Sequence, residues 1–255
     1  MANISKKAAL LIGINYTNDP INRLNGCCND VMNMAALLQT KYGFTSENIT
    51  VLADLEPALV ALTTYDSIIQ NIKELSEKSW KEDLDVAFFH YSGHGSQQTD
   101  FSGDEADGKD EGICPCDFAK RGLILDDELL KLFKTFNPKT TIFVVFDCCH
   151  SASMLDLPYV YPSLIPEKEV TVELPKIVMI SGCIDASTSE DAYDTNTRRF
   201  GGALTMCLNK VFHDNQSTVL SSLYERLLNY IKAGEHRQHP IMSSSFPIDT
   251  QLKMF

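Results

Sequence analysis

Hydrophobic residues along the chain occur in short runs of strand length, separated by segments in which they recur with a helical period. Four runs are almost continuously apolar, as expected of strands covered on both faces, and they span residues 8–15, 85–91, 140–147 and 176–183. Elsewhere a spacing of three and four residues predicts helices with one apolar face. These faces comprise Val31, Met34, Ala35 and Leu38, then Leu129, Leu130 and Phe133, and finally Leu220, Leu223, Tyr224, Leu227 and Ile231.

The alternation of strand and helix predicts an α/β fold, with a mostly parallel central sheet and helices on both faces. The 255 residues contain no internal repeat, low-complexity tract or obvious linker, so we expect a single domain over residues 1–255. In such sheets, ligand sites gather at the carboxyl ends of the strands. The residues that follow the apolar runs are therefore the first candidates for chemistry.

Composition narrows the possible partners and location of the chain. Hydrophobic residues make up 44% and charged residues 22%, which is typical of a globular protein. The chain has no membrane-length apolar run and no signal peptide, which favours a cytoplasmic or nuclear protein without a membrane partner. Its eight cysteines do not form a small secreted disulfide framework, which favours free thiols. The net charge of −12 disfavours nucleic acid and favours a cationic partner.

Polar clusters directly follow two of the apolar runs. Tyr-Ser-Gly-His-Gly at 91–95 follows the second run, and Asp-Cys-Cys-His-Ser at 147–151 follows the third. Both should emerge at the same edge of the sheet, which would bring His94 beside Cys149. An imidazole next to a thiol is the arrangement that nucleophilic catalysis requires.

The chemistry predicted for this pair is a hydrolysis in which Cys149 attacks a carbonyl carbon and His94 moves the proton. The backbone N–H groups of Gly95 and Cys149 are candidates for holding the oxyanion. The alternative is that Cys149 is an ordinary buried cysteine and His94 a turn residue, but this does not explain two polar clusters at strand ends. Cys148 is expected to point toward the core, and His150 to diverge from Cys149, so both are weaker candidates.

Acidic residues concentrate between positions 100 and 128. The segment is either a solvated loop or a site for a divalent cation that prefers hard oxygen ligands. An EF-hand is excluded, because aligning its turn glycine on Gly108 puts Gly103 at the first ligand position. Zinc is disfavoured because the cysteine spacings do not match paired C-x-x-C motifs. The acidic residues are Asp100, Asp104, Glu105, Asp107, Asp110, Glu111, Asp117, Asp126, Asp127 and Glu128, against Lys109, Lys120 and Arg121.

These motifs resemble those of the metacaspases, caspase-like cysteine peptidases, over nearly the whole chain. The shared features are the Gly-Ile-Asn-Tyr turn at 13–16, Gly-Cys-Cys-Asn-Asp at 26–30, the clusters at 91–95 and 147–151, the acidic pair at 126–127, and Ser-Gly-Cys at 181–183. The resemblance implies a caspase-like three-layer sandwich, with a large-subunit-like part to about residue 160 and a small-subunit-like part from about residue 170. It also implies that Cys149 is the nucleophile and His94 the general acid/base.

Metacaspases cleave after Arg or Lys, and the resemblance implies an acidic S1 pocket formed by Asp30 and Asp147, with Ser92 nearby. The residue types agree, because carboxylates in a partly dry pocket recognise a guanidinium well. The alternatives are structural, with Asp30 as the N-cap of a helix that starts at Val31 and Asp147 as a strand-end residue.

Many metacaspases need calcium, and Asp110, Asp126, Asp127 and Asp156 match the four aspartates that hold it in the family. We therefore expect calcium as the cofactor and as the main control of activity. Asp126 has an alternative role as the cap of a helix that extends to Phe136.

The chain departs from the family pattern in a few places. Ala152 replaces the glycine that usually follows Cys-His-Ser, and residues 184–189 are less polar than usual. The residues before the predicted first strand do not resemble a prodomain, and only about 20 residues separate Asp156 from the predicted strand at 176, so we expect a type I-like form without prodomain. Lys168, Arg198 and Arg199 in predicted loops are candidate autocleavage sites, the alternative for each being ordinary solvated charge.

The sequence therefore predicts a calcium-dependent cysteine endopeptidase that acts as a monomer on protein or peptide substrates with a basic P1 residue. A caspase that cuts after Asp would need arginines in place of Asp30 and Asp147. The alternative from a different class is a caspase-fold interaction protein that has lost catalysis, which the extra methyl group of Ala152 keeps open.

Overall fold

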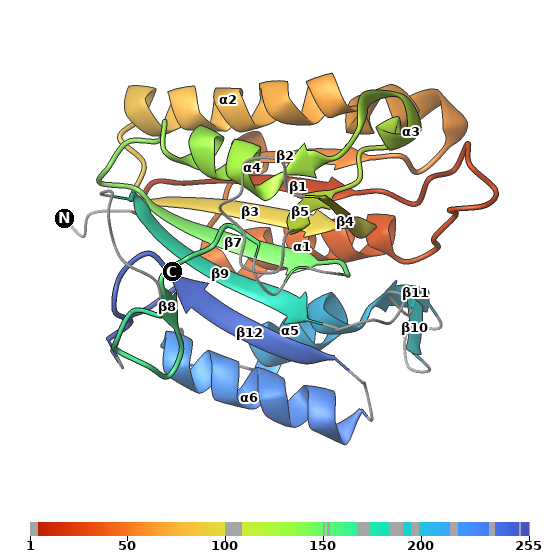
Figure 1. Ribbon diagram of the computed structural model, residues 1–255. Helices are drawn as coiled ribbons and strands as arrows, with labels where there is room; N and C mark the ends of the chain where they lie inside the picture. The colour runs from red at the N-terminus through yellow and green to blue at the C-terminus, as the bar shows by residue number, and fades with distance from the viewer. Residues whose placement is uncertain are drawn as a thin grey trace.

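The computed structural model describes residues 5–99, 109–149, 151, 154–167, 174–183, 191–194, 199–214, 219–234, 238–249 and 251–254. Its centre is a seven-stranded sheet with the order β2-β1-β3-β7-β9-β12-β8 (Figure 1). β2, β1, β3, β7 and β9 run parallel, and β12 pairs antiparallel with β9 and β8. The strands are β1 (Lys7–Gly13), β2 (Ile49–Ala53), β3 (Val86–Ser92), β7 (Thr141–Asp147), β8 (Tyr159–Val160), β9 (Lys176–Cys183) and β12 (His239–Ser244).

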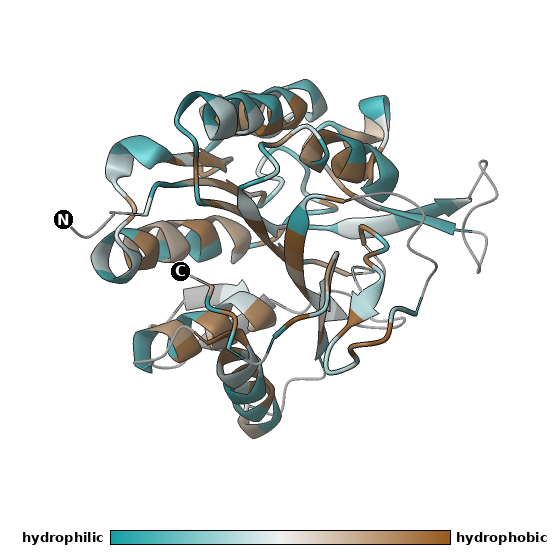
Figure 2. Cartoon of the chain, turned by 90° about the vertical axis from the view of Figure 1, so that its left-hand side faces the viewer, coloured by the Kyte–Doolittle hydropathy of each residue, from teal (hydrophilic) through white to brown (hydrophobic). Residues whose placement is uncertain are grey.

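Helices cover both faces of this sheet and turn their hydrophobic sides toward it (Figures 1 and 2). One face carries α2 (Tyr65–Lys81) and α4 (Asp126–Phe133), and the other carries α1 (Cys27–Tyr42), α5 (Ala203–Asp214) and α6 (Leu220–Ala233). Shorter helical segments are α3 (Phe118–Arg121), η1 (Ser46–Asn48) and η2 (Pro57–Thr63). The predicted α/β sandwich with a mostly parallel sheet is confirmed.

Alternation along the central strands builds two separate cores. In β3, Phe88 packs on the side of α1 and α5, whereas the Phe89 ring lies 5.4 Å from that of Phe133 in α4. Both kinds of position are buried, which is why the four predicted strands lack alternating polar residues.

Two smaller sheets complete the fold. β4 (Gly95–Thr99), β5 (Lys109–Ile113) and β6 (Ile124–Leu125) form an antiparallel sheet that starts where β3 ends, and β10 (Asp191–Asp194) pairs with β11 (Arg199–Gly202) just before α5. The hydrophobic pattern does not predict these strands, because they are short and contain no continuous apolar run. Their position matters, since β4 leads directly out of the histidine cluster.

Local signals set the bounds of the helices. α1 ends at Tyr42, and the Gly43 that follows has a left-handed backbone (φ 71°) with its N–H bonded to the carbonyl oxygen of Leu38. α2 begins after Thr64, whose side chain accepts a hydrogen bond from the Ser67 N–H. α4 ends before the predicted Phe136, because the chain tightens there into turns with hydrogen bonds between residues three apart.

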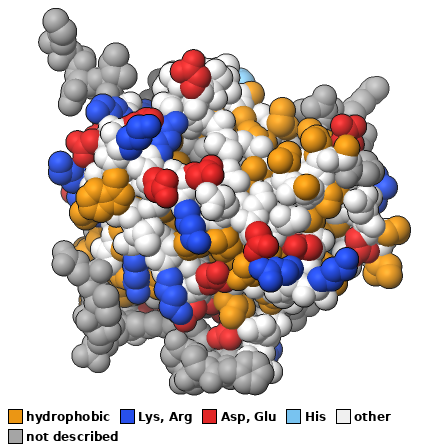
Figure 3. All heavy atoms as spheres, turned by 90° about the horizontal axis from the view of Figure 1, so that it is seen from above, with side chains coloured by type: hydrophobic (Ala, Val, Ile, Leu, Met, Phe, Trp, Pro, Cys, Tyr) orange, Lys and Arg blue, Asp and Glu red, His pale blue; other side chains and the backbone are white. Residues whose placement is uncertain are grey.

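The surface over α2 carries acidic and basic side chains interspersed with hydrophobic ones (Figure 3). Within the part of the chain that the structure describes, no helix has both the length and the hydrophobicity of a membrane span.

His90 is a polar residue in the middle of the sheet. Its Nε2 atom lies 3.0 Å from Thr205 Oγ1, and its Nδ1 atom has no hydrogen-bond partner among the described residues. Burial lowers the pKa of His90 to about 3. An unfolded histidine titrates near pH 6.5, so between these two pH values the unfolded chain binds more protons than the folded chain. The stability that neutral His90 provides is present above pH 6.5 and decreases as the pH falls toward 3.

We expect a His90→Leu variant to show a weaker dependence of stability on pH. In the parent protein, this histidine should lower the free energy of unfolding by about 2 kcal/mol between pH 7 and pH 5. Urea unfolding of both proteins at these two pH values, with Cys149→Ala in each to prevent self-cleavage, measures the difference. The lost contact with Thr205 affects the variant equally at both pH values and cancels. An identical pH dependence in the two proteins would contradict the burial of a neutral His90.

Candidate active site

The parallel pairing of β3 with β7 fixes the position of both predicted catalytic residues. Ser92 pairs with Asp147 at the end of the two strands, and His94 and Cys149 each follow two residues later. A Cβ atom at Gly95 would overlap the carbonyl oxygen of Cys149, so the two loops are in contact. The structure thus brings the histidine and cysteine clusters to one edge of the sheet, as predicted.

The loop that follows β1 holds the imidazole of His94. The Nε2 atom lies 2.8 Å from the carbonyl oxygen of Asn22, and the ring lies against that of Tyr16, with the centroids 4.7 Å apart. Because a carbonyl oxygen can only accept a hydrogen bond, Nε2 carries the proton in this contact. The basic lone pair is then on Nδ1, which is the atom that can take a proton from a thiol.

Tyr16 is fixed in turn by the buried carboxylate of Asp54, directly after β2. The Tyr16 backbone is left-handed (φ 54°), a conformation that is costly for a bulky residue. Asp54 accepts hydrogen bonds from the N–H groups on either side of it, from Asn15 at 2.6 Å and from Thr17 at 3.0 Å. The Tyr16 hydroxyl accepts a hydrogen bond from the His94 N–H at 2.9 Å. Asp54 therefore positions the histidine loop through Tyr16.

Neighbouring cysteines are poor candidates for the nucleophile. Burial raises the pKa of Cys114 to about 12, and it raises the pKa of Cys148 well above its usual range. Cys148 points into the core on the side of α2 and α4, as predicted. Thiols with such pKa values stay protonated at neutral pH, so neither Cys114 nor Cys148 competes well with Cys149 for the role of nucleophile. All seven cysteines whose side chains the structure describes are free thiols.

The ladder between β4 and β5 orients the amide of Gly95. The Cys114 N–H bonds to the carbonyl oxygen of His94 at 3.0 Å, which makes Gly95 and Ile113 the neighbouring, non-hydrogen-bonded pair. The Gly95 N–H therefore points away from β5. A donor outside the ladder is what an oxyanion site needs.

Asp30 and Asp147 converge on the start of α5. Asp147 Oδ2 accepts a hydrogen bond from the Thr205 N–H at 2.7 Å, and Asp30 Oδ2 accepts one from the Gly202 N–H at 2.9 Å. The Ser92 hydroxyl also donates to Asp30, at 2.8 Å. Asp30 is 1% exposed and Asp147 is 5% exposed. The three predicted pocket residues thus form one buried acidic group, stabilised by N–H groups at a helix N-terminus.

The structural alternatives for these aspartates need correction. α1 begins three residues before Asp30, which is therefore inside the helix and not its N-cap. Leu125 precedes α4, and Asp126 is the first residue of that helix, with its Oδ1 atom accepting a hydrogen bond from the Asp127 N–H at 2.8 Å. Asp147 does have a structural role, because it accepts a hydrogen bond from the first turn of α5.

A second group of carboxylates surrounds Asp126. Its pKa is raised to about 7, chiefly by burial and then by the negative charges of Asp156, Glu111 and Asp127, while the Asp127 N–H acts in the opposite direction. Asp156, which follows Cys149 in the chain, has a left-handed backbone (φ 44°). Three of the four predicted calcium residues therefore lie close enough for their charges to interact.

The acidic residues suit calcium by their chemistry, although their side chains are not arranged around a common point. Asp110 lies on β5, with Oδ2 3.5 Å from Gln98 Nε2, and Asp127 forms a 3.0 Å ion pair with Lys131. Within the described ranges, no three His, Cys, Asp or Glu side chains converge as metal ligands. Clustered carboxylate oxygens are nevertheless the ligands that calcium prefers, and its flexible coordination tolerates side chains that must move to reach it.

Some predicted features fall outside the described residues. They are His150, Ala152, Lys168, Arg198 and the segment 184–189, so autocleavage at the two basic residues stays a prediction. Arg199 is the first residue of β11, where a loop was expected.

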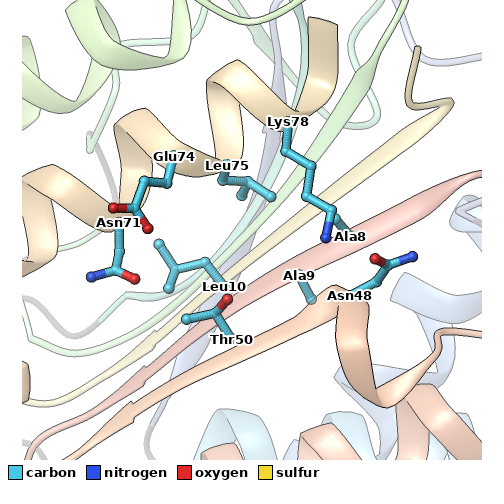
Figure 4. A pocket seen from close by; sticks show the side chains of 9 residues that line it. All are labelled: Ala8, Ala9, Leu10, Asn48, Thr50, Asn71, Glu74, Leu75 and Lys78. Carbon is cyan, nitrogen blue, oxygen red and sulfur yellow. The ribbon is translucent and has the colours of Figure 1, made fainter. Parts of the chain in front are cut away.

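A cavity of about 190 Å³ lies between β1, β2 and α2, toward the start of β1 (Figure 4). β1 runs parallel to β3 and pairs Ala8 with Ala87, so this cavity lies at the opposite end of the strands from His94. Its lining contains neither histidine nor cysteine, and it is separate from the candidate active site. The lining residues are Ala8, Ala9, Leu10, Asn48, Thr50, Asn71, Glu74, Leu75 and Lys78.

Comparisons with known proteins identify the family to which this chain belongs. A family model for the metacaspase peptidase C14 domain matches residues 6–158, which include His94 and Cys149. The chain belongs to the metacaspase family. It is 36% identical over 260 residues to metacaspase-3 of Trypanosoma brucei brucei, covering 94% of this chain and 71% of that protein. It is 32% identical over 302 residues to metacaspase-1B of Aspergillus oryzae, covering 97% and 70%. A crystal structure of a Geobacter sulfurreducens protein matches with a TM-score of 0.68 and 25% identity, covering 97% of each chain.

This metacaspase is a cysteine peptidase, as predicted. The structure adds supporting residues that the sequence does not reveal. Asn22 contributes only a backbone carbonyl, so its side chain carries no signal, and Asp54 is one aspartate among many. Tyr16 lies in a recognised motif, but nothing in the sequence indicates that its ring faces His94.

We expect Gly95→Ala to remove most peptidase activity while the fold persists. The added methyl group would overlap the carbonyl oxygen of Cys149 and displace the Gly95 amide, and loss of one oxyanion donor typically costs about 10²- to 10³-fold in kcat. Gly182→Ala is a matched control, because its new Cβ would find its nearest neighbour at 3.5 Å, an ordinary contact. Peptide hydrolysis and thermal unfolding should be measured together. Equal activity in the two variants would argue against this role for Gly95.

Proposed function

We propose that this metacaspase is a calcium-dependent endopeptidase that acts as a monomer and cleaves after Arg or Lys. One observation supports it above all others. The pairing of Ser92 with Asp147 places the predicted dyad and a buried acidic group at the same edge of the sheet. A nucleophile beside a pocket of negative charge suits a peptide bond that follows a basic side chain.

The proposed reaction uses only groups at this edge. His94 Nδ1 takes the thiol proton as Cys149 attacks the carbonyl carbon of the scissile bond, and the Asn22 carbonyl stabilises the resulting imidazolium at Nε2. The N–H groups of Gly95 and Cys149 hold the oxyanion. The imidazolium then protonates the leaving amine, which produces a thioester on Cys149. Water activated by His94 hydrolyses this thioester and frees the enzyme.

The environment of Asp30 and Asp147 supports a basic P1 residue. The carboxylates accept hydrogen bonds from N–H groups at the start of α5, and Asp30 also accepts one from the Ser92 hydroxyl, so uncharged donors orient them. A guanidinium or ammonium group that enters from the substrate would gain charge-assisted hydrogen bonds in a nearly dry site. A P1 aspartate would meet like charges there.

We expect Asp147→Asn to abolish the preference for a charged P1 side chain. Asn keeps an oxygen for the Thr205 N–H, so α5 stays anchored while the charge is lost. Hydrolysis of matched peptides with P1 arginine or neutral citrulline measures the effect. The kcat/KM for arginine should fall at least about 30-fold, because breaking a buried charge pair costs about 2–5 kcal/mol.

The citrulline peptide is the control, since its rate should change little. An unchanged arginine-to-citrulline ratio would remove Asp147 from the S1 pocket. If the parent protein hydrolysed neither peptide at any calcium concentration, with its fold intact by circular dichroism, an interaction protein without catalysis would be the better assignment.

The connectivity around Asp126 supports control by calcium. β6 ends directly before Asp126, and β6 pairs with β5, which pairs with β4 as it leaves His94 and Gly95. Asp156 follows Cys149 closely in the sequence. Calcium bound by Asp110, Asp126, Asp127 and Asp156 would supply positive charge where carboxylates now repel one another. That change in charge would act on both loops that carry the predicted catalytic residues.

We expect the peptidase to be inactive in EGTA and to gain activity with stepwise addition of calcium. The rise should be at least about tenfold, the effect of stabilising the active arrangement by about 1.4 kcal/mol. Magnesium should replace calcium poorly, because it demands a small octahedral site. The assay follows an Arg-peptide, with Cys149→Ala as the blank. Full activity in chelator would refute calcium control.

A further inference from the structure

Two buried tyrosines meet beneath the loop that carries His94. Tyr91 lies near the end of β3 and Tyr16 follows β1, and their hydroxyl oxygens are 3.2 Å apart. A Cβ atom at Gly93 would lie 2.5 Å from the Tyr91 hydroxyl oxygen and 3.2 Å from that of Tyr16, so the loop backbone rests directly on the pair. Phe89, two residues earlier on the same face of β3, fills its place in this core with no polar atom. The Tyr91 hydroxyl is costly to bury there unless it forms hydrogen bonds.

The two hydroxyls divide the backbone groups of His94 between them. The Tyr16 hydroxyl accepts the His94 N–H at 2.9 Å and donates its proton to the carbonyl oxygen of Cys114 at 2.8 Å. The Tyr91 hydroxyl donates to the carbonyl oxygen of His94 at 2.8 Å, its shorter contact, since the Cys114 oxygen is 3.1 Å away. Burial raises the pKa of both hydroxyls well above the usual range, so both keep the proton that they donate. His94 is therefore held at its N–H by one tyrosine and at its carbonyl by the other.

The hydrogen bond to the His94 carbonyl also orients the amide of Gly95. The two groups belong to one planar peptide unit and point in opposite directions, so a donor that fixes the carbonyl also fixes the N–H. A carbonyl oxygen has two lone pairs, and here one donor is the Cys114 N–H at 3.0 Å and the other is the Tyr91 hydroxyl. The first donor comes from the strand ladder of β5, whereas the second comes from β3 in the central sheet.

We propose that Tyr91 is a positioning residue for the oxyanion donor, because its hydroxyl holds the peptide unit between His94 and Gly95 so that the Gly95 N–H faces the scissile carbonyl. This inference rests on the proposed role of Gly95. It ties the donor to β3, the strand whose pairing with β7 also sets the position of Cys149. An oxyanion donor acts through its preorganised direction, so the loss of an orienting bond weakens binding of the transition state more than binding of the substrate. Tyr91 itself does not touch the substrate.

The test compares Tyr91→Phe with the parent in the full chain. The variant keeps the aromatic ring, and its fold should persist, because the Cys114 carbonyl keeps the Tyr16 hydroxyl and the His94 carbonyl keeps the Cys114 N–H. Tyr224→Phe is the matched control. The Tyr224 hydroxyl is also buried and donates to a backbone carbonyl, that of Pro240 at 2.8 Å, but it lies between α6 and β12. Circular dichroism and thermal unfolding verify that both variants are folded.

We expect Tyr91→Phe to hydrolyse an Arg-peptide in the presence of calcium with a kcat about tenfold lower and a KM nearly unchanged. This is part of the 10²- to 10³-fold that removal of an oxyanion donor typically costs. The pH profile of kcat/KM should match that of the parent, because the His94 imidazole keeps its contact with the Asn22 carbonyl. Tyr224→Phe should match the parent in kcat, KM and pH profile.

Two inhibitors separate an effect on the oxyanion site from a general disturbance. A peptide aldehyde with P1 arginine adds reversibly to Cys149 and places an oxygen where the oxyanion forms, whereas the matching peptide alcohol cannot react with the thiol. Tyr91→Phe should raise the Ki of the aldehyde about tenfold, in parallel with kcat, and leave the Ki of the alcohol unchanged.

An equal loss of affinity for both inhibitors would show a merely structural effect and overturn the inference. Parent-like kcat and aldehyde affinity in Tyr91→Phe, with activity lost in Gly95→Ala, would overturn the role of Tyr91 and leave that of Gly95 intact. Parent-like activity in both variants would overturn both roles.

Discussion

The register of β3 against β7 is the constraint on which the rest of this molecule depends. Because Ser92 pairs with Asp147, the residues two positions later, His94 and Cys149, leave the sheet side by side. The same register directs Ser92 and Asp147 to the face covered by α1 and α5, where both take part in the acidic group. Cys148 falls on the opposite face and is buried. A shift of one residue in the register of β3 against β7 would move His94 away from Cys149. It would also turn side chains that now line the acidic group toward the opposite core.

Two buried acidic groups near this edge differ in how their charge is stabilised. Asp30 and Asp147 accept hydrogen bonds from N–H groups at the start of α5. Such donors stabilise buried carboxylates even when no substrate is bound. Around Asp126 the neighbours are other carboxylates, and Glu111 leaves one oxygen without a partner in the described structure. The carboxylates of the first group are held by backbone donors, whereas those of the second group repel one another. This difference suits a specificity pocket in one case and a regulatory site in the other.

The sequence predicts those parts of the molecule that are encoded locally. Continuous apolar runs identify β1, β3, β7 and β9, and the polar clusters after two of them contain the predicted dyad. β2 and β12 have weaker patterns, and β4, β5 and β6 are too short to show one. The supports of His94 are also missed, because a backbone carbonyl from Asn22 and a carboxylate from Asp54 become relevant only after the chain folds. Glu111 is hidden for another reason, since ten acidic residues in its segment look alike before burial distinguishes them.

The two catalytic loops are tied to the same point by different kinds of structure. From Gly95, the path runs through the hydrogen-bonded strands β4, β5 and β6 to Asp126. On the side of Cys149, the two consecutive residues Leu155 and Asp156 have left-handed backbones. That backbone costs about 1–2 kcal/mol per residue, so contacts at the loop end must maintain it. Leu155 is anchored in the core, but Asp156 faces other carboxylates. If calcium binds there as proposed, the change of charge at Asp126 would act on the strands that lead to Gly95 and on the strained backbone of Leu155 and Asp156, which follow Cys149 in the chain.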